Sequence, residues 1–245
     1  MGDALTLTVL GCSGSYAGPG DACSGYLVRA GDTAVVLDLG PGTFANLQAH
    51  VDPAEVDGLV LTHEHPDHWV DLPILRNAFR YVLDIEGLDV YGTEGTRALA
   101  TALIDELPPT LVWHTAAPGE TLAVGPLAFG FGLTDHPVET LAVRVEAGGR
   151  TLLYSADTGP GWDPGLLGEG VDVLLCEASL GPEHEGEVLH LSARQAGGLA
   201  RAIGADRLVL THIVPGVDED TQRTLAAAAY GGEVAIATTG ATFTI

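Results

Sequence analysis

The chain has 245 residues, 46% of them hydrophobic, and a formal net charge of −23 at pH 7. Its ten basic residues are all arginine, and they form no basic patch of the kind that long nucleic acids need for charge neutralisation. No stretch approaches the roughly 18–20 consecutive apolar residues of a membrane span. Length and composition therefore exclude a membrane-spanning chain, disfavour long nucleic acid as a partner, and suit a single folded domain over residues 1–245.

The three cysteines, Cys12, Cys23 and Cys176, have neither the number nor the CxxC spacing of a disulfide framework. An odd number of thiols is typical of a reducing compartment, and the acidic chain start lacks the cationic segment of a signal peptide. We therefore expect a cytoplasmic protein. Cys12 lies in a glycine-rich stretch, where a small buried residue is the ordinary interpretation and a functional thiol the alternative.

The first part of the chain alternates short apolar segments with Gly- and Pro-containing turns, which predicts strands joined by tight connections. Strands are predicted over residues 5–10, 25–30, 33–39, 59–62 and 88–91. Helices are predicted over 41–50, over about 67–82 with Leu72, Leu75, Phe79 and Val82 on one face, and over 93–106 with Thr93 as N-cap.

The second part repeats this pattern. Strands are predicted over residues 127–134, 141–146, 151–155, 171–176 and 208–211, and a helix over 192–203. The Gly148-Gly149 pair predicts a hairpin turn between two of these strands. Blocks of strands with helices inserted between them indicate an α/β protein, in which two sheets pack face to face and helices cover both outer faces.

The most informative segment is the run His63-Glu64-His65-Pro66-Asp67-His68, which directly follows the predicted strand at 59–62. Three imidazoles and a carboxylate in so short a loop would be crowded and partly unpaired without a metal ion. His136, Asp157 and His212 also each follow a predicted strand. Together these side chains predict a site for two divalent ions at one edge of the sheets. Nitrogen and oxygen ligands favour zinc and also admit manganese or iron.

The sequence resembles the metallo-β-lactamase superfamily in the 63–68 motif, in the order of the later ligands, and in segments from Leu10-Gly11-Cys12-Ser13-Gly14-Ser15 to Leu210-Thr211-His212. The resemblance implies a four-layer αββα sandwich, a dinuclear centre and a tendency to form homodimers. It assigns His63, His65 and His136 to one ion, Asp67, His68 and His212 to the other, and Asp157 to both as a bridge. His50, His114 and His184 are expected to be ordinary core or surface residues.

Two further segments look like those that mark the phosphodiesterase branch of the superfamily, which includes tRNase Z and cyclic-phosphate enzymes. They are Val173-Leu174-Leu175-Cys176-Glu177-Ala178-Ser179 and His190-Leu191-Ser192-Ala193-Arg194-Gln195-Ala196. The resemblance implies that Glu177 orients His190, which faces the scissile phosphate. A carboxylate fixes the imidazole tautomer and raises its pKa, so that His190 can protonate the departing oxygen. The alternative is a surface acid and a residue that merely precedes a helix N-cap.

The hypothesis for the activity is metal-assisted hydrolysis of a phosphodiester. Two ions would lower the pKa of a shared water toward neutrality, and the resulting hydroxide would attack phosphorus. Asp67 is then both a ligand and the expected acceptor of the water proton. A small anionic substrate is compatible with the acidic chain, because the ions themselves place positive charge in the site.

Five segments, 10–15, 154–159, 176–179, 189–192 and 210–215, are similar to those of an atypical class of bacterial cyclic-nucleotide phosphodiesterases. This resemblance implies a substrate such as 3′,5′-cAMP. Trp69, Phe79 and Trp162 are candidates for stacking on its base only through their proximity to the motifs, and the alternative is that they are core residues, as aromatics more often are. The first alternative is tRNase Z-like processing of RNA 3′ ends. That family commonly carries a long arm for tRNA between the positions of His136 and Asp157, where this chain has room for only a hairpin.

A lactonase or thioesterase that uses the same metals is a second alternative. The Glu177/His190 pair counts against it, because metal-activated hydroxide opens an ester without such an acid. A non-catalytic binding module is disfavoured, since every ligand position is filled. A β-lactamase is disfavoured because those enzymes usually lack the aspartate at the position of Asp157 and are secreted.

Overall fold

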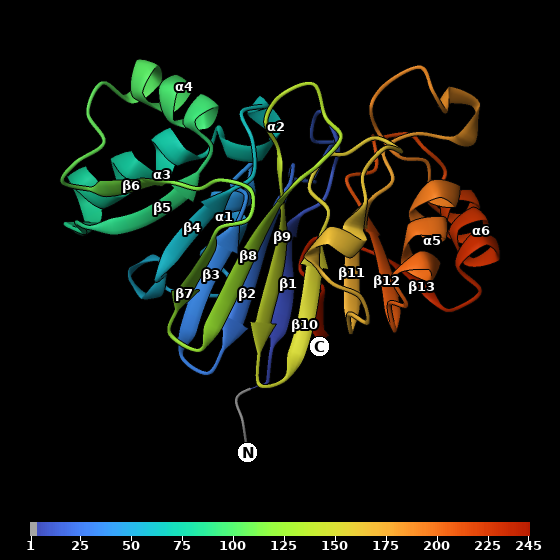
Figure 1. Ribbon diagram of the computed structural model, residues 1–245. Helices are drawn as coiled ribbons and strands as arrows, with labels where there is room; N and C mark the ends of the chain where they lie inside the picture. Colours follow the sequence, from blue (N-terminus) through green and yellow to red (C-terminus); the bar gives the residue numbers. More distant parts are fainter. Residues whose placement is uncertain (1–3) are drawn as a thin grey trace.

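The computed structural model describes residues 4–245, within which two seven-stranded sheets lie face to face (Figure 1). The acidic chain start, residues 1–3, lies outside the described residues. In order across the first sheet, the strands are β14 (Thr242–Thr244), β1 (Thr6–Gly11), β2 (Gly25–Ala30), β3 (Thr33–Leu37), β4 (Gly58–Leu61), β5 (Leu88–Gly92) and β6 (Leu111–Thr115). Those of the second sheet are β13 (Val234–Ile236), β12 (Arg207–Thr211), β11 (Val173–Glu177), β10 (Arg150–Tyr154), β9 (Leu141–Ala147), β8 (Leu127–Leu133) and β7 (Thr121–Val124).

Strand direction decides which loops gather at the same edge. In the first sheet β3, β4, β5 and β6 are parallel neighbours. In the second sheet β10, β11, β12 and β13 are parallel, and β8 runs in the same direction as β10 because both pair antiparallel with β9. The carboxyl ends of parallel strands meet at one edge, where crevices for ligands form. The residues that follow β8, β10 and β12 are therefore delivered to the same edge.

The two sheets bury a shared apolar core between them. Strands such as β4 and β11 are buried along their whole length, because a central strand in a layered α/β protein is covered on both faces. Tyr26 from the first sheet and Tyr154 from the second meet across this interface, with ring centroids 5.0 Å apart. The Tyr26 hydroxyl lies 2.6 Å from Oγ1 of Thr211. This contact connects the end of β12, which directly precedes the candidate ligand His212, to the opposite sheet.

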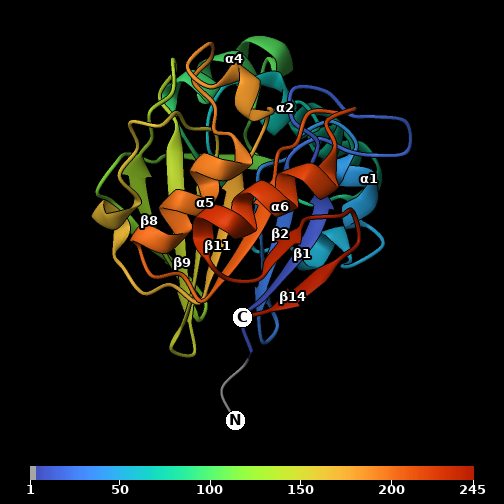
Figure 2. The same ribbon diagram turned by 90° about the vertical axis from the view of Figure 1, so that its right-hand side faces the viewer.

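Helices cover the outer faces (Figure 1). On the first sheet lie α1 (Thr43–Leu47), α2 (Pro66–Trp69), α3 (Leu72–Ala78) and α4 (Glu94–Ile104), and on the second α5 (Ala193–Ala202) and α6 (Glu219–Tyr230), which Figure 2 shows in front of the sheet. A Cβ at Gly197 of α5 would lie 2.4 Å from the carbonyl oxygen of Ala226, so these two helices pack closely only because residue 197 is glycine. The predicted four-layer αββα sandwich is confirmed.

The predicted single helix over about 67–82 is wrong. The chain forms α2 and α3 with a break between them, followed by a π-helical turn at Phe79–Leu83. The cause is a tertiary contact, since the backbone of Leu39 accepts from Asp71 N–H and donates to His68 C=O at the break. Val82, predicted on the buried face, is 78% exposed.

The sequence prediction also omitted the four strands at the sheet edges, β6, β7, β13 and β14, and the helix α6. Edge strands are half-exposed and short, so their sequences lack the apolar run that identifies a central strand. The predicted hairpin around Gly148-Gly149 is present as β9 and β10, and both glycines have positive φ. Among the described residues, no helix combines the length and apolarity that crossing a lipid bilayer would take.

Candidate metal centre

The candidate ligands lie at the edge where β4, β8, β10 and β12 end. His63 and His65 are in the loop between β4 and α2, and Asp67 and His68 belong to α2 itself. His212 directly follows β12 with φ of 54°, a left-handed conformation that turns the chain and directs the imidazole back toward the other sheet. His136 and Asp157 come three residues after the ends of β8 and β10.

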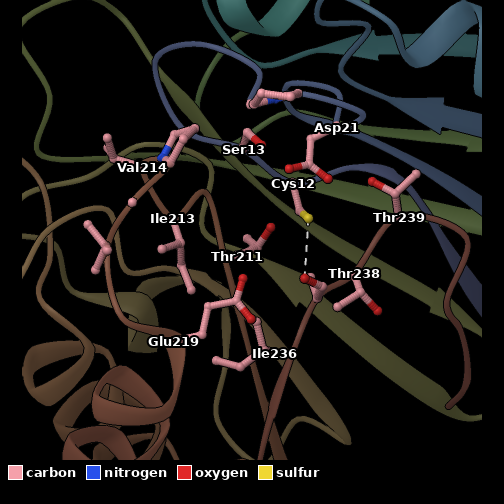
Figure 3. Close-up of a pocket in the computed structure, with 16 residues that line it drawn as sticks. Cys12, Ser13, Asp21, Thr211, Ile213, Val214, Glu219, Ile236, Thr238 and Thr239 are labelled. Atoms are coloured by element: carbon pink, nitrogen blue, oxygen red, sulfur yellow. Dashed lines mark hydrogen bonds between the residues drawn. The ribbon is translucent and has the colours of Figure 1, made fainter.

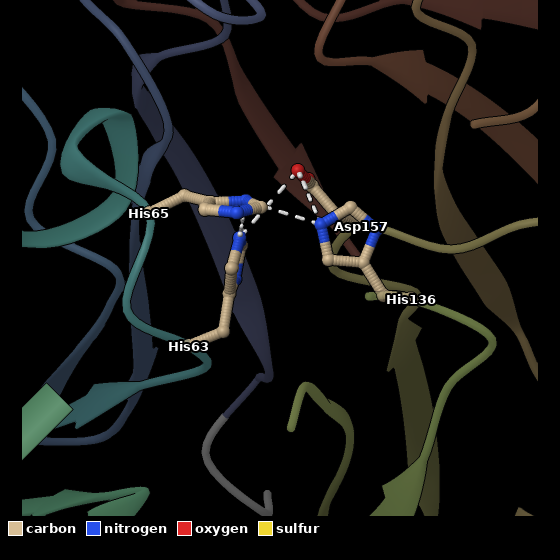
Figure 4. A group of neighbouring side chains, drawn as sticks. All are labelled: His63, His65, His136 and Asp157. Atoms are coloured by element: carbon tan, nitrogen blue, oxygen red, sulfur yellow. Dashed lines mark hydrogen bonds and ion pairs between the residues drawn. The ribbon is translucent and has the colours of Figure 1, made fainter. Parts of the chain in front are cut away.

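The first group of ligand atoms comes from His63, His65, His136 and Asp157, whose donor atoms all lie within 4.8 Å of one another (Figure 4). Nε2 of His63 and Nε2 of His136 each lie 3.1 Å from Nδ1 of His65. Oδ2 of Asp157 lies 3.5 Å from Nε2 of His63. Three imidazoles and one carboxylate oxygen therefore converge on one small volume.

The second group consists of Asp67, His68 and His212, again with donor atoms within 4.8 Å. Nε2 of His212 lies 3.2 Å from Oδ2 of Asp67 and 3.3 Å from Nε2 of His68. Oδ1 of Asp157 lies 3.1 Å from Nε2 of His68. Asp157 thus stands between the two groups and turns one oxygen toward each.

Hydrogen bonds on the outer ring nitrogens determine where each histidine carries its proton. Nδ1 of His68 lies 2.8 Å from Oδ2 of Asp38, and Nδ1 of His136 lies 3.2 Å from the carbonyl oxygen of Leu189. Since carboxylate and carbonyl oxygens only accept, both Nδ1 atoms are donors. In the neutral tautomer the Nε2 atom of each ring, which faces the cluster, then carries a lone pair.

A hydroxyl group fixes the tautomer of two further histidines. Thr62 Oγ1 donates to Asp38 at 3.0 Å and therefore accepts from Nδ1 of His63, also at 3.0 Å. Ser179 Oγ donates to the buried carboxylate of Glu177 and accepts from Nδ1 of His212 at 2.8 Å. In their neutral tautomers, His63 and His212 consequently also turn unprotonated Nε2 atoms toward the cluster.

These residues fit divalent cations. In the neutral tautomers, lone pairs face one another at the 3.3 Å contact between Nε2 of His68 and Nε2 of His212, and buried Oδ1 of Asp157 has no hydrogen-bond partner among the described residues. Buried acceptors that point at one another are unfavourable unless a cation lies among them. Nitrogen and oxygen donors without thiolate suit zinc, manganese or iron.

The electrostatics of the protein favour the ligand protonation state at His63, His136 and Asp67 but not at His68. Burial and the neighbouring His68 lower the pKa of His63 to about 4, and burial together with His63 lowers the pKa of His136 to about 4. Although burial opposes it, His212 and His68, when their imidazoles are protonated, hold the pKa of Asp67 well below its usual value through a hydrogen bond and their charge. His63 and His136 are therefore neutral at neutral pH and Asp67 is ionised, as metal ligands must be.

The protonation state of His68 differs from that of the other ligands. Although burial opposes it, the charges of Asp157 and Asp38 raise the pKa of His68 well above its usual value. A bound cation would therefore have to displace the proton on Nε2 of His68.

Asp38 is a residue of this site that the sequence analysis did not identify. It follows β3, is fully buried, and has φ of 58°. Its carboxylate accepts from Thr62 N–H at 2.8 Å, from the hydroxyl of Tyr154 at 2.9 Å, and from His68 and Thr62 as described. One carboxylate thus orients His68 directly and His63 through Thr62. Asp38 fell inside the predicted strand over 33–39, whereas β3 ends at Leu37. The position after a strand, which the ligands share, was therefore not visible for this residue.

The pair Glu177 and His190 lies beside the two ligand groups. Nδ1 of His190 donates to Oε1 of the fully buried Glu177 at 2.9 Å. The His190 ring lies 5.3 Å from the ring of His136 and 5.6 Å from that of His212. Burial opposes protonation, but the hydrogen bond and charge of Glu177 outweigh it and raise the pKa of His190 to about 9. His190 therefore differs from His63 and His136 in carrying a proton on both ring nitrogens at neutral pH.

Residues 33–213 match the family described as the Beta-lactamase superfamily domain. The chain belongs to the beta-lactamase superfamily. Members of this superfamily typically bind divalent metal ions, and the paired His/Asp groups of the structure are consistent with that property.

Two relatives within the beta-lactamase superfamily align over nearly the whole chain. Protein Rv1339 of Mycobacterium tuberculosis is 38% identical over 243 residues, covering 94% of this chain and 88% of that protein. The probable metallo-hydrolase YhfI of Bacillus subtilis is 30% identical, covering 96% and 98%. The crystal structure of YhfI superposes with a TM-score of 0.92 over 98% of this chain and 99% of that one.

Ribonuclease Z of Mycobacterium bovis is a third relative, 28% identical over 273 residues and covering 95% of each chain. Together with the family match, these relatives place the chain among the metallo-hydrolases of the superfamily. It is an enzyme of the hydrolytic class.

The aromatic residues expected to stack on a nucleobase do not line the centre. Trp69, Phe79 and Trp162 are 4%, 1% and 5% exposed and belong to the apolar layers between sheet and helices. Of the two alternatives, the structure therefore supports the core and excludes a base platform built from these residues. His114 and His184, expected outside the site, bind Asp89 and Glu187 at the surface.

A cavity of about 290 Å³ lies between the loop after β1 and the loops after β12 and β13 (Figure 3). Its walls include Cys12, Asp21 and Glu219. The Cys12 thiol donates to the carbonyl oxygen of Ala237 at 3.2 Å. Burial, followed by the charges of Asp21 and Glu219, raises the pKa of Cys12 to about 12. This thiol stays protonated at neutral pH, which opposes a role as a nucleophile.

Proposed function

We propose that this metallo-hydrolase is a dinuclear phosphodiesterase whose substrate is a small cyclic nucleotide such as 3′,5′-cAMP. The observation that carries the proposal is the position of His190, which forms a third group of potential ligand atoms with Asp157 and His212. Its outer nitrogen is committed to Glu177, and its place next to both ligand groups gives it access to a substrate held there. Cleaving a phosphodiester releases an alkoxide, which needs such a proton donor.

The ligand assignment follows the two groups. We assign His63, His65 and His136 to one ion, and Asp67, His68 and His212 to the other, with Asp157 shared between them. Divalent ions there, zinc in our proposal, would acidify a water molecule and neutralise charge on the phosphate oxygens.

Three residues of the chain then handle protons. Glu177 favours the protonated form of His190 and holds its ring, so that the other nitrogen, Nε2, presents a proton to the departing oxygen. Asp67 keeps an ionised carboxylate in the second group, where its Oδ2 accepts from Ser15 N–H at 2.8 Å. We assign Asp67 the additional role of accepting the proton of the attacking water.

A small substrate agrees with the surroundings of the centre. Among the described residues, no arginine belongs to the ligand groups or hydrogen-bonds to one of their side chains. The segment between His136 and Asp157 is the β9–β10 hairpin, which leaves no long arm for a folded RNA at that point. The net charge of −23 further opposes a polyanion.

RNA 3′ processing is the second candidate, because ribonuclease Z is among the relatives that match 95% of the chain. Its chemistry would use the same ions and the same His190. The two candidates differ in substrate size, so a single set of assays separates them.

The test is hydrolysis of 3′,5′-cAMP by protein loaded with zinc or with manganese, followed by chromatography, with Asp67→Ala as the blank. Conversion to 5′-AMP that the variant lacks is the expected result. Two bound metal ions per chain without conversion would refute the cyclic-nucleotide assignment. Parallel assays with RNA 3′ ends, a lactone and a thioester would then identify the substrate class that the centre does accept.

A further inference from the structure

Ser179 occupies the junction between one proposed metal ligand and the proposed proton donor. Its side chain is 1% exposed, in the loop that follows β11. Its Oγ lies 2.8 Å from Nδ1 of His212, 2.7 Å from Oε2 of Glu177 and 3.3 Å from Nδ1 of His190. A single hydroxyl group therefore contacts all three residues.

The proton count fixes the direction of each hydrogen bond. The carboxylate of Glu177 can only accept, so Ser179 donates its one proton to Oε2. The hydroxyl oxygen must then accept from Nδ1–H of His212. The chain of bonds runs from His212 through Ser179 to Glu177, which also accepts from His190.

Glu177 itself is held rigidly. Besides His190 and Ser179, the backbone N–H groups of Thr158 and Leu191 donate to it, at 2.6 and 3.2 Å. Each carboxylate oxygen thus has two donors. Because Glu177 is fully buried and saturated, it is a fixed reference point to which Ser179 connects His212.

The two imidazoles are oriented alike as a result. The rings of His190 and His212 are stacked, with centroids 5.6 Å apart and planes inclined by 21°. Both turn Nδ1 toward the Ser179–Glu177 unit. Both Nε2 atoms therefore point away from that unit, and Nε2 of His212 lies 3.4 Å from Oδ1 of Asp157 within the ligand cluster.

We infer that Ser179 is a positioning residue that sets the proton donor His190 in register with the ligand His212. The inference rests on the proposed function, in which His190 protonates the leaving group. It adds a specific coupling, because one hydroxyl group would orient a metal ligand and, through Glu177, the acid that works beside it. Interactions of this kind behind metal ligands change metal affinity or activity by about 10–100-fold.

The experiment uses Ser179→Ala, with Ser24→Ala as the matched control. Ser24 is another fully buried serine, and its hydroxyl has no hydrogen-bond partner among the described residues. Turnover and KM are measured at saturating zinc on two diesters. The first is 3′,5′-cAMP, whose alkoxide needs protonation, and the second is bis(p-nitrophenyl) phosphate, whose nitrophenolate departs without it. Zinc affinity is measured separately by titration against a chromophoric chelator.

The expected result is a fall of about 10–100-fold in kcat for cAMP in Ser179→Ala, with KM little changed. Turnover of the nitrophenyl diester stays near that of the wild type, and one zinc ion binds more weakly. In a His190→Ala background, Ser179→Ala should add little further loss on cAMP. Ser24→Ala should resemble the wild type throughout.

Equal losses on both diesters, or no loss on either, would overturn the inference. A wild-type protein that binds two zinc ions and cleaves neither diester would instead refute the proposed function. The zinc titration would then test, independently of the proposed function, whether Ser179 positions His212. Weaker binding in Ser179→Ala but not in Ser24→Ala would uphold its positioning of His212, and unchanged binding would overturn it.

Discussion

His63, His68 and His136 each have a hydrogen-bond partner of their own outside the ligand cluster, and the partners differ in kind. They are a threonine hydroxyl, a buried aspartate and a backbone carbonyl. A carboxylate behind a ligand imidazole fixes its ring and increases its basicity more than a neutral acceptor does. Asp38, which serves His68 directly and His63 through Thr62, should therefore influence metal binding more than any other residue outside the cluster.

Replacing Asp38 by asparagine keeps the volume of the side chain but removes its charge and two of its acceptor sites. We expect zinc affinity to fall by about 10–100-fold, because His68 loses the carboxylate that orients it. Titration with a competing chelator measures this. Tyr154→Phe is the matched control, since it removes only one donor to Asp38, and its loss should be smaller. Wild-type affinity in Asp38→Asn would show that the tautomer of His68 is fixed by other contacts.

His190 and Glu177 should behave as one unit in kinetics. His190→Ala is expected to lower cAMP turnover by about 10²–10⁴-fold, the usual contribution of a general acid, while the metal content stays at the wild-type level. Glu177→Gln should lower it as well, and the double variant should lose little more than His190→Ala alone. Steady-state rates and metal analysis of the three variants test this. Additive losses would assign the two residues to separate roles.

The elements that carry the site were predictable in part, and the reason lies in burial. Central strands such as β4 and β11 are continuously apolar, which the sequence displays directly. The break between α2 and α3 depends on Leu39, a residue distant in sequence that bonds to both sides of it. The hydrophobic periodicity of the predicted helix depends on local sequence alone and does not indicate such a contact. The edge strands were missed because half-exposed segments carry a weak pattern.

Thr93 was predicted as the N-cap of α4, and its side chain accepts from Thr96 N–H at 3.3 Å. We expect Thr93→Ala to lower the free energy of unfolding by about 1 kcal/mol, the usual cost of losing such a cap. Chemical denaturation measures the change, with Thr93→Ser as the control that keeps the acceptor. Hydrolytic activity of the folded protein should be unaffected, since within residues 4–245 no hydrogen bond joins the Thr93 side chain to a proposed ligand. A loss of activity at full folding would mean that α4 also supports the site.

At the scale of the whole molecule, the proposed centre draws its ligands from both sheets. The 63–68 motif is short and rich in histidine, so the sequence alone identified the four ligands that it contributes. His136, Asp157 and His212 were predicted from their places after strands. The orienting roles of Asp38 and Ser179 were not predicted. A single aspartate among 33 acidic residues, or a single serine, acquires such a role only when distant segments of the chain meet. Ligands were therefore more predictable than the residues that orient them.

Because the proposed ligands come from both sheets, metal removal should lower the stability of the whole fold. Ions that bind the native state alone stabilise it, by about 2.7 kcal/mol per site when the free metal is at 100 times its Kd. We expect dialysis against a chelator to lower the melting temperature and zinc to restore it. Asp67→Ala, which lacks one ligand of the second group, should respond less than the wild type. Identical responses would place the bound zinc outside this centre.

The distance in sequence between the ligands has a consequence for kinetics. His68 and His212 meet across 144 positions of the chain, and a contact of that span becomes favourable only after the intervening loop has closed. We therefore expect ions that join them to stabilise the native state but not the transition state for folding. Interactions of that type slow unfolding and leave the refolding rate nearly unchanged. Metal supply would then govern how long each folded molecule survives rather than how quickly it forms.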